Sequence, residues 1–397
     1  MKLAVVTNIL TPYRIPFFES IGRRVDELTV LLMAEAEENR EWTLPPVGFR
    51  TRVLRRFHLR GPGREVSLHV NYGVMGLLRT LDPDVVMSGG FTVANVAAFL
   101  YCKWFGKKYV GWGELTLRDG AGSSAIRRLI RRWLISRSDG CIASSSEAHD
   151  AFRHYGAGSR PILTSLMPVE VTRFHEQAMA FKRSPEYRAL RSRYVHPILM
   201  AVGRLTDAKG YPELFAIYEQ ILETRPQVSL LLVGDGPDRP RYQRFVQEKR
   251  WSDVHFLGFV DSGELPKYLA TADVFVFPTR SDTFGAVLSE AMSSELPVVS
   301  SVFAAATRDL IEDGVTGFRF DPSNTESSAA TLLKILAMSP ETRRWIGLAA
   351  YARVQHSDCA PSADVVVRFL ESVLHKGRAS ESDRFERSAL VKGGTRL

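Results

Sequence analysis

Residues 273–299 read DVFVFPTRSDTFGAVLSEAMSSELPVV, and this stretch decides the fold that the sequence predicts. Residues 274–277 form a short apolar run that a proline ends, which is typical of a buried strand. A polar turn over 279–283 follows, and good helix formers continue from Gly285 until Pro297 ends them. The stretch therefore predicts a strand, a turn, a helix and a second strand, the βαβ unit of a parallel sheet.

The start of that helix is a candidate anion site. The first backbone amides of a helix have no partners within it and lie at the positive end of its dipole, so they can hold a phosphate. The amides concerned belong to Phe284, Gly285, Ala286 and Val287. Asp282 lies just before this turn, and Glu290 follows within the helix. A single helical glutamate is most often a solvated surface residue, so the spacing alone assigns no role.

The same stretch resembles the E-x7-E region of retaining glycosyltransferases with the GT-B fold, chiefly those of family 4. Four elements match in order: a carboxylate at Asp282, the dipeptide FG, the tripeptide EAM and the tripeptide PVV. Two departures are that Asp282 replaces a glutamate, with roughly 1.5 Å less reach, and that Glu295 stands where a glycine is usual. The resemblance implies that Glu290 holds the ribose hydroxyls of a nucleotide-diphosphate sugar and that Asp282 contacts the donor sugar.

Two further loops in the second half resemble loops of that family. The sequence VGRL followed by KG resembles the family's phosphate-binding loop, which implies that Arg204 and Lys209 neutralise the diphosphate. Each charge-assisted bond would contribute about 1.5–3 kcal/mol. The loop at Gly258 and Val260 would lie beside the nucleotide base. The resemblance thus implies a UDP- or GDP-linked sugar as donor, with no other cofactor and no metal ion.

The first half of the chain is less similar to the family. Its opening strand leads into the loop TPYR, so Thr11, Tyr13 and Arg14 are candidate site residues at the edge where parallel strands end. A structural loop braced by proline explains them equally well. A strand from Tyr109 delivers Glu114 to a point where family members commonly place a histidine near the donor sugar. Glu114 is therefore a catalytic candidate, and a plain ion pair with an arginine is the alternative.

The composition is that of a protein with two hydrophobic cores. The chain has 397 residues, 45% of them apolar and 24% charged, which is more than one core usually supports. Three cysteines lie far apart and predict neither a disulfide framework nor a metal cluster, which fits a reducing cytosol. No apolar run reaches the roughly 18 residues of a membrane span, and the sequence begins without a secretion signal. We therefore expect a cytoplasmic protein.

The pattern of strands and helices predicts two α/β domains, and the resemblance implies that they are Rossmann-like and face each other across a cleft, as in the GT-B fold. We expect an acceptor-binding domain over 1–174, a connection over 175–195 and a nucleotide-sugar-binding domain over 196–355. A helix over 356–375 is expected to cross back to the first domain, as the resemblance implies. The tail over 376–397 is charged and rich in Gly and Ser, which predicts disorder.

Positive charge is concentrated in the first half of the chain. Of the formal net charge of +8, residues 1–170 carry 23 Lys and Arg against 16 Asp and Glu, a net of +7. Residues 124–137 predict an amphipathic helix whose apolar face consists of Ile126, Leu129, Ile130, Trp133 and Leu134. Four arginines lie outside that face: Arg127, Arg128, Arg131 and Arg132. We expect this helix to attach the protein to the inner face of an anionic cytoplasmic membrane, with inward packing as the alternative.

Together with these features, the resemblance implies a retaining glycosyltransferase of the hexosyltransferase class. It would transfer a sugar to a hydroxyl of a glycan or of a polyprenyl-diphosphate-linked acceptor, in cell-surface polysaccharide or glycolipid assembly. Its catalytic candidates are Asp282, Arg204, Lys209 and Glu114. A related sugar-nucleotide epimerase and a non-catalytic basic protein that binds polysaccharide or nucleic acid are the alternatives. We expect no nucleic acid as partner, because the sequence lacks a zinc signature and an aromatic-interleaved basic motif.

Overall fold

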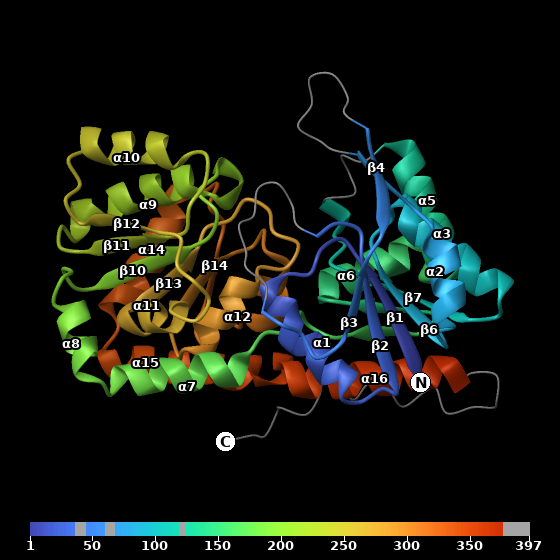
Figure 1. Ribbon diagram of the computed structural model, residues 1–397. Helices are drawn as coiled ribbons and strands as arrows, with labels where there is room; N and C mark the ends of the chain where they lie inside the picture. The colour runs from blue at the N-terminus through green and yellow to red at the C-terminus, as the bar shows by residue number, and fades with distance from the viewer. Residues whose placement is uncertain (36–44, 60–67, 119–123, 376–397) are drawn as a thin grey trace. The chain divides into compact units, whose positions relative to one another are not determined.

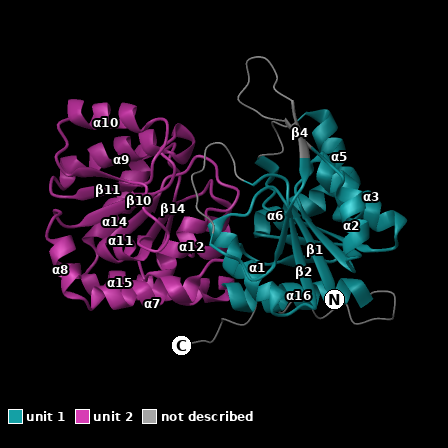
Figure 2. Cartoon of the chain, in the orientation of Figure 1, with its two compact units in different colours: residues 1–168, 359–397 teal, residues 169–358 magenta. Residues whose placement is uncertain are grey.

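The computed structural model describes residues 1–35, 45–59, 68–118 and 124–375. The chain forms two compact units, one of Met1–Pro168 with Cys359–Leu397 and one of Val169–Asp358 (Figure 2). Each unit is built around its own parallel sheet with helices on both faces (Figure 1). The last helix that the structure describes belongs to the first unit, so the chain leaves that unit once and returns to it.

A seven-stranded sheet forms the centre of the first unit, and all its neighbouring strands are parallel. Its spatial order is β3 (Arg50–Val53), β2 (Glu27–Leu32), β1 (Lys2–Thr7), β6 (Val85–Gly89), β7 (Lys108–Gly113), β8 (Gly140–Ala143) and β9 (Ile162–Thr164). A separate antiparallel pair consists of β4 (Arg55–Leu59) and β5 (Leu68–Tyr72). The strand order reverses between β1 and β6, the kind of position where open α/β sheets bind ligands.

Helices cover both faces of this sheet because central strands such as β1 bury their side chains on both sides. On one face α1 (Ile15–Gly22) and α16 (Cys359–His375) share an apolar core with Leu3 and Val5 of β1. On the other face α2 (Val74–Leu81) and α3 (Val93–Trp104) pack against Ala4 and Val6. The remaining elements are η1 (Pro12–Arg14), α5 (Ala125–Arg137), α6 (Ser146–Phe152) and η2 (Arg153–Ala157).

A six-stranded parallel sheet forms the centre of the second unit. Its spatial order is β12 (Val254–Gly258), β11 (Ser229–Val233), β10 (Ile198–Val202), β13 (Val274–Phe277), β14 (Val298–Ser301) and β15 (Phe318–Phe320). The strand order of this sheet reverses between β10 and β13. The βαβ unit predicted over 273–299 is confirmed, since β13, α12 (Ala286–Ser293) and β14 follow one another there.

The helices of the second unit also form two layers. On one face α9 (Tyr211–Thr224), α10 (Arg239–Glu248) and α14 (Thr325–Ala337) share a core with Leu199 and Ala201 of β10. Among the other helices, α7 (Val171–Lys182) contacts α11 (Leu265–Thr271) and α12. The remaining elements are α8 (Pro185–Arg191), η3 (Asp207–Lys209), α13 (Ala305–Leu310), α15 (Pro340–Val354) and η4 (Gln355–Ser357).

The segment expected as a connection over 175–195 differs in the structure. It forms most of α7 and all of α8, and both helices belong to the second unit. Only Val171, Phe174 and Ala178 of α7 are buried, so its apolar stripe is too narrow to show as a clear period. The tail over 376–397 lies outside the described residues.

Candidate functional site

The loops after β10 and β13 meet at the point where the strand order of the second sheet reverses. Gly210 has a φ of 76°, and a Cβ atom at this position would lie 1.9 Å from the carbonyl oxygen of Pro278. Only glycine permits such an approach. The Arg280 amide also donates a hydrogen bond of 3.0 Å to the carbonyl of Ala208. Backbone contacts therefore fix the loop after β10 against the loop after β13.

This contact brings Lys209 to Asp282. The lysine Nζ lies 2.5 Å from the carboxylate Oδ2, and both side chains are half-buried. The other oxygen, Oδ1, accepts a hydrogen bond of 3.2 Å from the Phe284 amide. The Asp282 amide donates to the carbonyl of Phe303, and its carbonyl accepts from the Ala305 amide, each at 3.2 Å. Hydrogen bonds therefore fix both the backbone and the side chain of Asp282, and its carboxylate holds Lys209 next to the start of α12.

The start of α12 has the geometry of an anion site. Gly285 precedes the helix with a φ of 95°, and a Cβ atom there would lie 2.5 Å from the ring of Phe277. The amides of Ala286 and Val287 begin the helix and have no partners within it. Of the four amides expected to hold a phosphate, that of Phe284 is already bonded to Asp282.

Arg204 lies at the same edge, just beyond β10. The amide of Gly203 donates to Val233 at 2.9 Å, and that of Leu205 donates to Asp235 at 3.0 Å, so the backbone on both sides of Arg204 is fixed. The side chain itself is exposed, and no residue that the structure describes accepts a hydrogen bond from its guanidinium. Arg204 is therefore held at the site with its charge available to an anion.

Glu290 lies within α12 and is half-buried. Burial raises the pKa of its carboxyl to about 7. The positive charge of Arg173 lowers this pKa, and the negative charge of Glu170 raises it by a smaller amount. Glu170 and Arg173 pair at 2.8 Å, and the buried Nε of Arg173 has no hydrogen-bond partner among the described residues. Neither residue was predicted as a site residue, although a charged pair at i and i+3 within PVEVTRF was a visible signal.

Gly258 ends β12 at the same edge of the sheet, because all six strands are parallel. Its φ is 76°, and its carbonyl accepts a hydrogen bond of 2.7 Å from the Gly234 amide. Val260 follows two residues later and is half-buried. The guanidinium of Arg239, which pairs with Asp235 at 2.5 Å, lies 3.4 Å from where a Cβ of Gly258 would be.

In the first unit, Arg14 and Glu114 form an ion pair. The Arg14 Nη2 lies 2.5 Å from Oε1 of Glu114, and its Nη1 donates to the Thr7 hydroxyl at 3.3 Å. The guanidinium also lies 4.8 Å from the ring centroid of Trp112. Glu114 is therefore paired with an arginine, which is the alternative that we weighed against a catalytic role. Tyr13 is half-buried next to this pair in the sequence.

Helix α5 only partly follows the expected pattern. Ile130 and Trp133 pack against the core of the first unit, with the Trp133 ring 4.7 Å from that of Phe99, so they do not face outward as the membrane hypothesis supposed. Ile126 and Leu129, expected on the same apolar face, are 71% and 68% exposed. The reason is that the helix approaches the core only with its C-terminal half, where Leu134 and Ile135 are buried. Arg127, Arg128 and Arg132 are exposed, and Arg131 is half-buried.

Residues 188–353 match the family described as glycosyl transferases group 1. This part of the chain is therefore similar to the members of that family. The chain is also similar to the sulfoquinovosyl transferase SQD2 of Arabidopsis thaliana, with 33% identity over 165 residues, 41% of this chain and 31% of that protein. It is 29% identical over 234 residues to a phosphatidyl-myo-inositol mannosyltransferase of Propionibacterium freudenreichii, which is 57% of this chain and 55% of that one. The match thus spans less than a third of the first relative and about half of the second.

A further relative matches over more of its length. A GDP-mannose-dependent alpha-mannosyltransferase of Mycolicibacterium smegmatis is 29% identical over 322 residues, 77% of this chain and 78% of that one. Among solved structures, sucrose-phosphate synthase from Thermosynechococcus elongatus superposes with a TM-score of 0.73 at 18% identity, covering 94% of this chain and 98% of that chain. Anabaena HepE in complex with UDP-glucose gives 0.72 at 19% identity, covering 94% and 100%. The fold is therefore GT-B, as predicted.

Within the part of the chain that matches this family, the structure brings most predicted residues to one edge of one sheet. The residues at the ends of its strands and the start of α12 are Arg204, Lys209, Gly258, Val260, Asp282, Phe284, Gly285, Ala286 and Val287. Glu290 lies deeper in the same helix, while Tyr13 and Glu114 belong to the other unit. No group of three or more His, Cys, Asp or Glu in the described part of the chain could hold a metal ion. None of its described helices is long and apolar enough to span a membrane.

Proposed function

We propose that this protein is a retaining glycosyltransferase that binds a nucleotide-diphosphate sugar at the edge of the second sheet where its strands end. The observation that carries the proposal is the Lys209–Asp282 pair, placed beside the start of α12 where the strand order reverses. Open α/β sheets bind ligands at such a reversal, and a helix start with an adjacent cation suits a phosphate.

In this proposal the diphosphate leaving group is held by fixed positive groups. Lys209 and the exposed Arg204 supply full charges, and the amides of Gly285, Ala286 and Val287 supply dipoles. Because their backbone is locked before substrate arrives, they need little rearrangement when charge develops on the phosphate. Preorganised groups of this kind usually make the largest contribution to catalysis.

The remaining residues of the edge orient the donor. Glu290 binds the ribose hydroxyls, and a carboxyl with a pKa near 7 can both accept and donate hydrogen bonds at neutral pH. Gly258 and Val260 lie beside the base and contact it mainly through their backbone. Asp282 contacts the donor sugar once the diphosphate competes for Lys209, because its Oδ2 is then released from the ion pair.

The first unit binds the acceptor in this proposal. Tyr13 and Glu114 contact the sugar or the acceptor, with Arg14 holding the Glu114 carboxylate in place. Substitution takes place on the same face of the sugar, and the departing phosphate takes the proton of the acceptor hydroxyl. The acceptor would be a glycan or a polyprenyl-diphosphate-linked lipid in cell-surface polysaccharide or glycolipid assembly. A relative named phosphatidyl-myo-inositol mannosyltransferase supports a lipid-linked acceptor.

We further propose that α5 attaches the protein to the inner face of an anionic cytoplasmic membrane. Ile126 and Leu129 expose apolar side chains in the same helix as the exposed Arg127 and Arg128. Apolar burial and the attraction of arginines to anionic lipid would act together on this segment.

A panel of radiolabelled UDP- and GDP-sugars tests the proposed reaction. We expect one of them to be hydrolysed slowly and to transfer its sugar to a lipid-linked or oligosaccharide acceptor, with the anomeric configuration retained in the NMR spectrum of the product. Epimerisation of the sugar while it stays on the nucleotide would instead identify an epimerase. Failure to turn over any member would favour a binding protein.

A further inference from the structure

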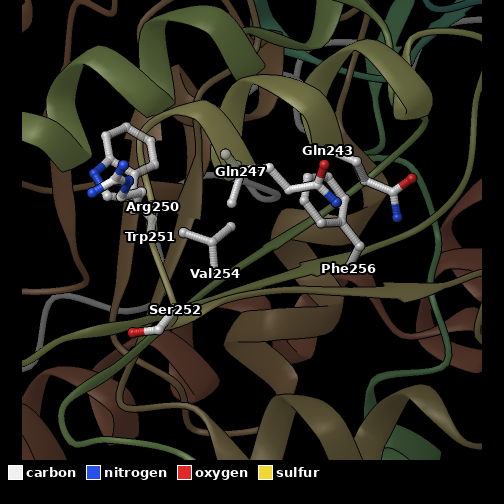
Figure 3. A pocket seen from close by; sticks show the side chains of 8 residues that line it. Gln243, Gln247, Arg250, Trp251, Ser252, Val254 and Phe256 are labelled. Carbon is white, nitrogen blue, oxygen red and sulfur yellow. The ribbon is translucent and has the colours of Figure 1, made fainter.

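A hollow of about 390 Å³ opens between α10 and β12 of the second unit (Figure 3). Its volume lies within the roughly 300–1,000 Å³ of small-molecule sites. Its lining includes none of the residues assigned above to the donor. The side chains that decide its chemistry are Gln243, Gln247, Arg250, Trp251, Val254 and Phe256.

The sequence spacing explains why these side chains converge. Gln243 and Gln247 are four residues apart on α10, so they share one face of the helix, and Arg250 follows seven residues after Gln243. Val254 and Phe256 are two residues apart on β12, so both point to the same side of the sheet. Since β12 is an edge strand, the groove between it and α10 opens to one side.

Arg250 adopts a backbone conformation in which glycine is usual. Its φ is 56°, and its amide and that of Trp251 close the end of α10 by donating to the carbonyls of Gln247 and Val246 at 3.0 and 3.2 Å. A side chain in this left-handed conformation costs about 1–2 kcal/mol. Strain of this kind at the rim of a pocket points to a use for the side chain. Figure 3 shows Arg250 beside Trp251 at one end of the hollow.

Trp251 is a rigid platform at that end. Its ring packs against three aromatic rings behind it, with centroid distances of 5.2 Å to Tyr218, 5.7 Å to Phe245 and 6.2 Å to Phe215. It is nevertheless only half-buried, as is Phe256 on the strand. Two partly exposed aromatic rings therefore contribute to one hollow together with two side-chain amides.

We propose that this hollow binds a pyranose unit of a glycan chain. The C–H faces of a pyranose are apolar and pack on aromatic rings, while its hydroxyls both donate and accept hydrogen bonds. The amides of Gln243 and Gln247 do both as well, and Arg250 adds donors. The lining holds no carboxylate and a single cation, which suits a neutral or weakly acidic sugar better than a phosphate. The ligand class follows from this lining and does not depend on the proposed transfer reaction.

A second copy of the chain is the other candidate occupant, because edge strands pair readily with other strands. The register of β12 against β11 shifts between Leu232 and Val233, where Val233 pairs with Gly258. Irregularities of this kind twist an edge away from partners. Polar side chains also interrupt the apolar part of the lining, so it lacks the continuous apolar surface of a stable dimer interface.

A glycan array tests this inference with the full-length protein. The array carries oligosaccharides of glucose, mannose, galactose and uronic acids in α and β linkage, and the best ligand is then titrated by calorimetry. We expect the double variant Gln243→Ala/Gln247→Ala to lose at least tenfold in affinity. Arg250→Gly should lose affinity while its thermal unfolding temperature stays equal or rises, because the backbone strain is relieved. Arg244→Ala, an exposed change on the same helix outside the hollow, is the matched control and should bind as wild type does.

Three results would overturn the inference. They are an array on which no glycan binds, a double variant with unchanged glycan affinity, and a wild-type dimer in sedimentation that is monomeric in the double variant. UDP- and GDP-sugar affinity is measured in parallel and should not change in any of these variants. If the wild-type protein bound a glycan but no UDP- or GDP-sugar, the proposed function would be wrong and the glycan site would still be supported.

Discussion

Each unit carries an ion pair of 2.5 Å at the edge where its parallel strands end, but the two pairs are held in different ways. Lys209 and Asp282 meet because the backbones of two loops touch at a glycine. Arg14 and Glu114 meet through side chains alone, with the guanidinium resting on Trp112. A site fixed by the backbone tolerates little change in its glycines, whereas a site fixed by side chains can be altered by single substitutions. We infer that the Lys209–Asp282 site binds the donor and that the Arg14–Glu114 site binds the acceptor.

The largest effect should come from breaking the backbone contact itself. Gly210→Ala would place a Cβ atom 1.9 Å from the Pro278 carbonyl oxygen, and we expect a loss of about 3–5 kcal/mol in the free energy of unfolding. Gly106→Ala in the first unit is the matched control, since its φ is 66° but nothing lies within 4 Å. It should cost about 1–2 kcal/mol. If both variants lost the same free energy of unfolding, measured by heat or urea, the contact between Gly210 and Pro278 would not restrict the residue at position 210.

Removing one carboxylate from each pair should separate donor from acceptor effects. Asp282→Ala should lower kcat about 100-fold, because a small displacement of reacting groups has effects of that size. Asp282→Glu should be tolerated or faster. Glu114→Gln should leave donor affinity within about twofold of wild type and change the KM of the acceptor. An Asp282→Glu protein that is inactive yet stably folded would show that the pocket is built around the shorter side chain.

Glu290→Gln should weaken donor binding and stabilise the folded protein. A carboxyl that accepts the ribose hydroxyls contributes on the order of 1.5–3 kcal/mol, so affinity should fall roughly 10- to 100-fold. The pKa of Glu290 is raised from 4.5 to about 7, so the folded state holds the proton more tightly than the unfolded state. Stability of the wild type should therefore fall as the pH rises from about 4.5 to 7.

The Glu290→Gln variant lacks this titration, so at about pH 8 it should be more stable than wild type by about 3 kcal/mol. Urea unfolding at about pH 5 and about pH 8 measures the difference. Glu223→Gln, an exposed change on α9, is the control and should show neither effect. Wild-type donor affinity of the Glu290→Gln variant in calorimetry would refute the ribose assignment.

The smallest effect concerns the membrane. Each arginine of α5 near an anionic surface contributes about 1 kcal/mol, and the attraction fades within roughly 8 Å at physiological salt. Wild type should therefore sediment with anionic vesicles at low salt and be released at high salt. Replacing Arg127, Arg128, Arg131 and Arg132 by glutamine should abolish sedimentation, whereas a control with Arg183, Arg188, Arg193 and Arg244 replaced should sediment normally. Equal sedimentation of both variants would exclude α5 as the attachment surface.

The sequence predicted the second unit better than the first for a physical reason. Gly210 and Gly285 are required by backbone geometry, so they appear as a motif in the chain itself. Contacts such as Arg14 with Glu114 join residues 100 positions apart through side chains, and no local pattern encodes them. For α5 the period correctly indicated an amphipathic helix, but it could not show that only half of the apolar face reaches the core.

One departure from the family pattern is explained only by the structure. Glu295 replaces a glycine that is usual there, and its φ is 55°, the left-handed conformation that favours glycine. Its carboxylate lies 3.8 Å from His175. Burial lowers the pKa of Lys182, and the charge of Glu295 opposes this shift. The charge of Glu295 therefore lies near two residues of α7, and both lie more than 110 positions away in the sequence.

The central claim is that protein groups alone neutralise the diphosphate of the donor at the edge of the second sheet. The most direct measurement is calorimetric titration of UDP-glucose and GDP-mannose into wild type, Lys209→Ala and Lys249→Ala in the presence of EDTA. Lys249 is a matched control because it also pairs with a carboxylate, Glu219, in the same unit. We predict that wild type and Lys249→Ala bind one of the two donors equally well and that Lys209→Ala binds it at least tenfold more weakly. Binding that requires added manganese, or equal binding by Lys209→Ala, would contradict the account.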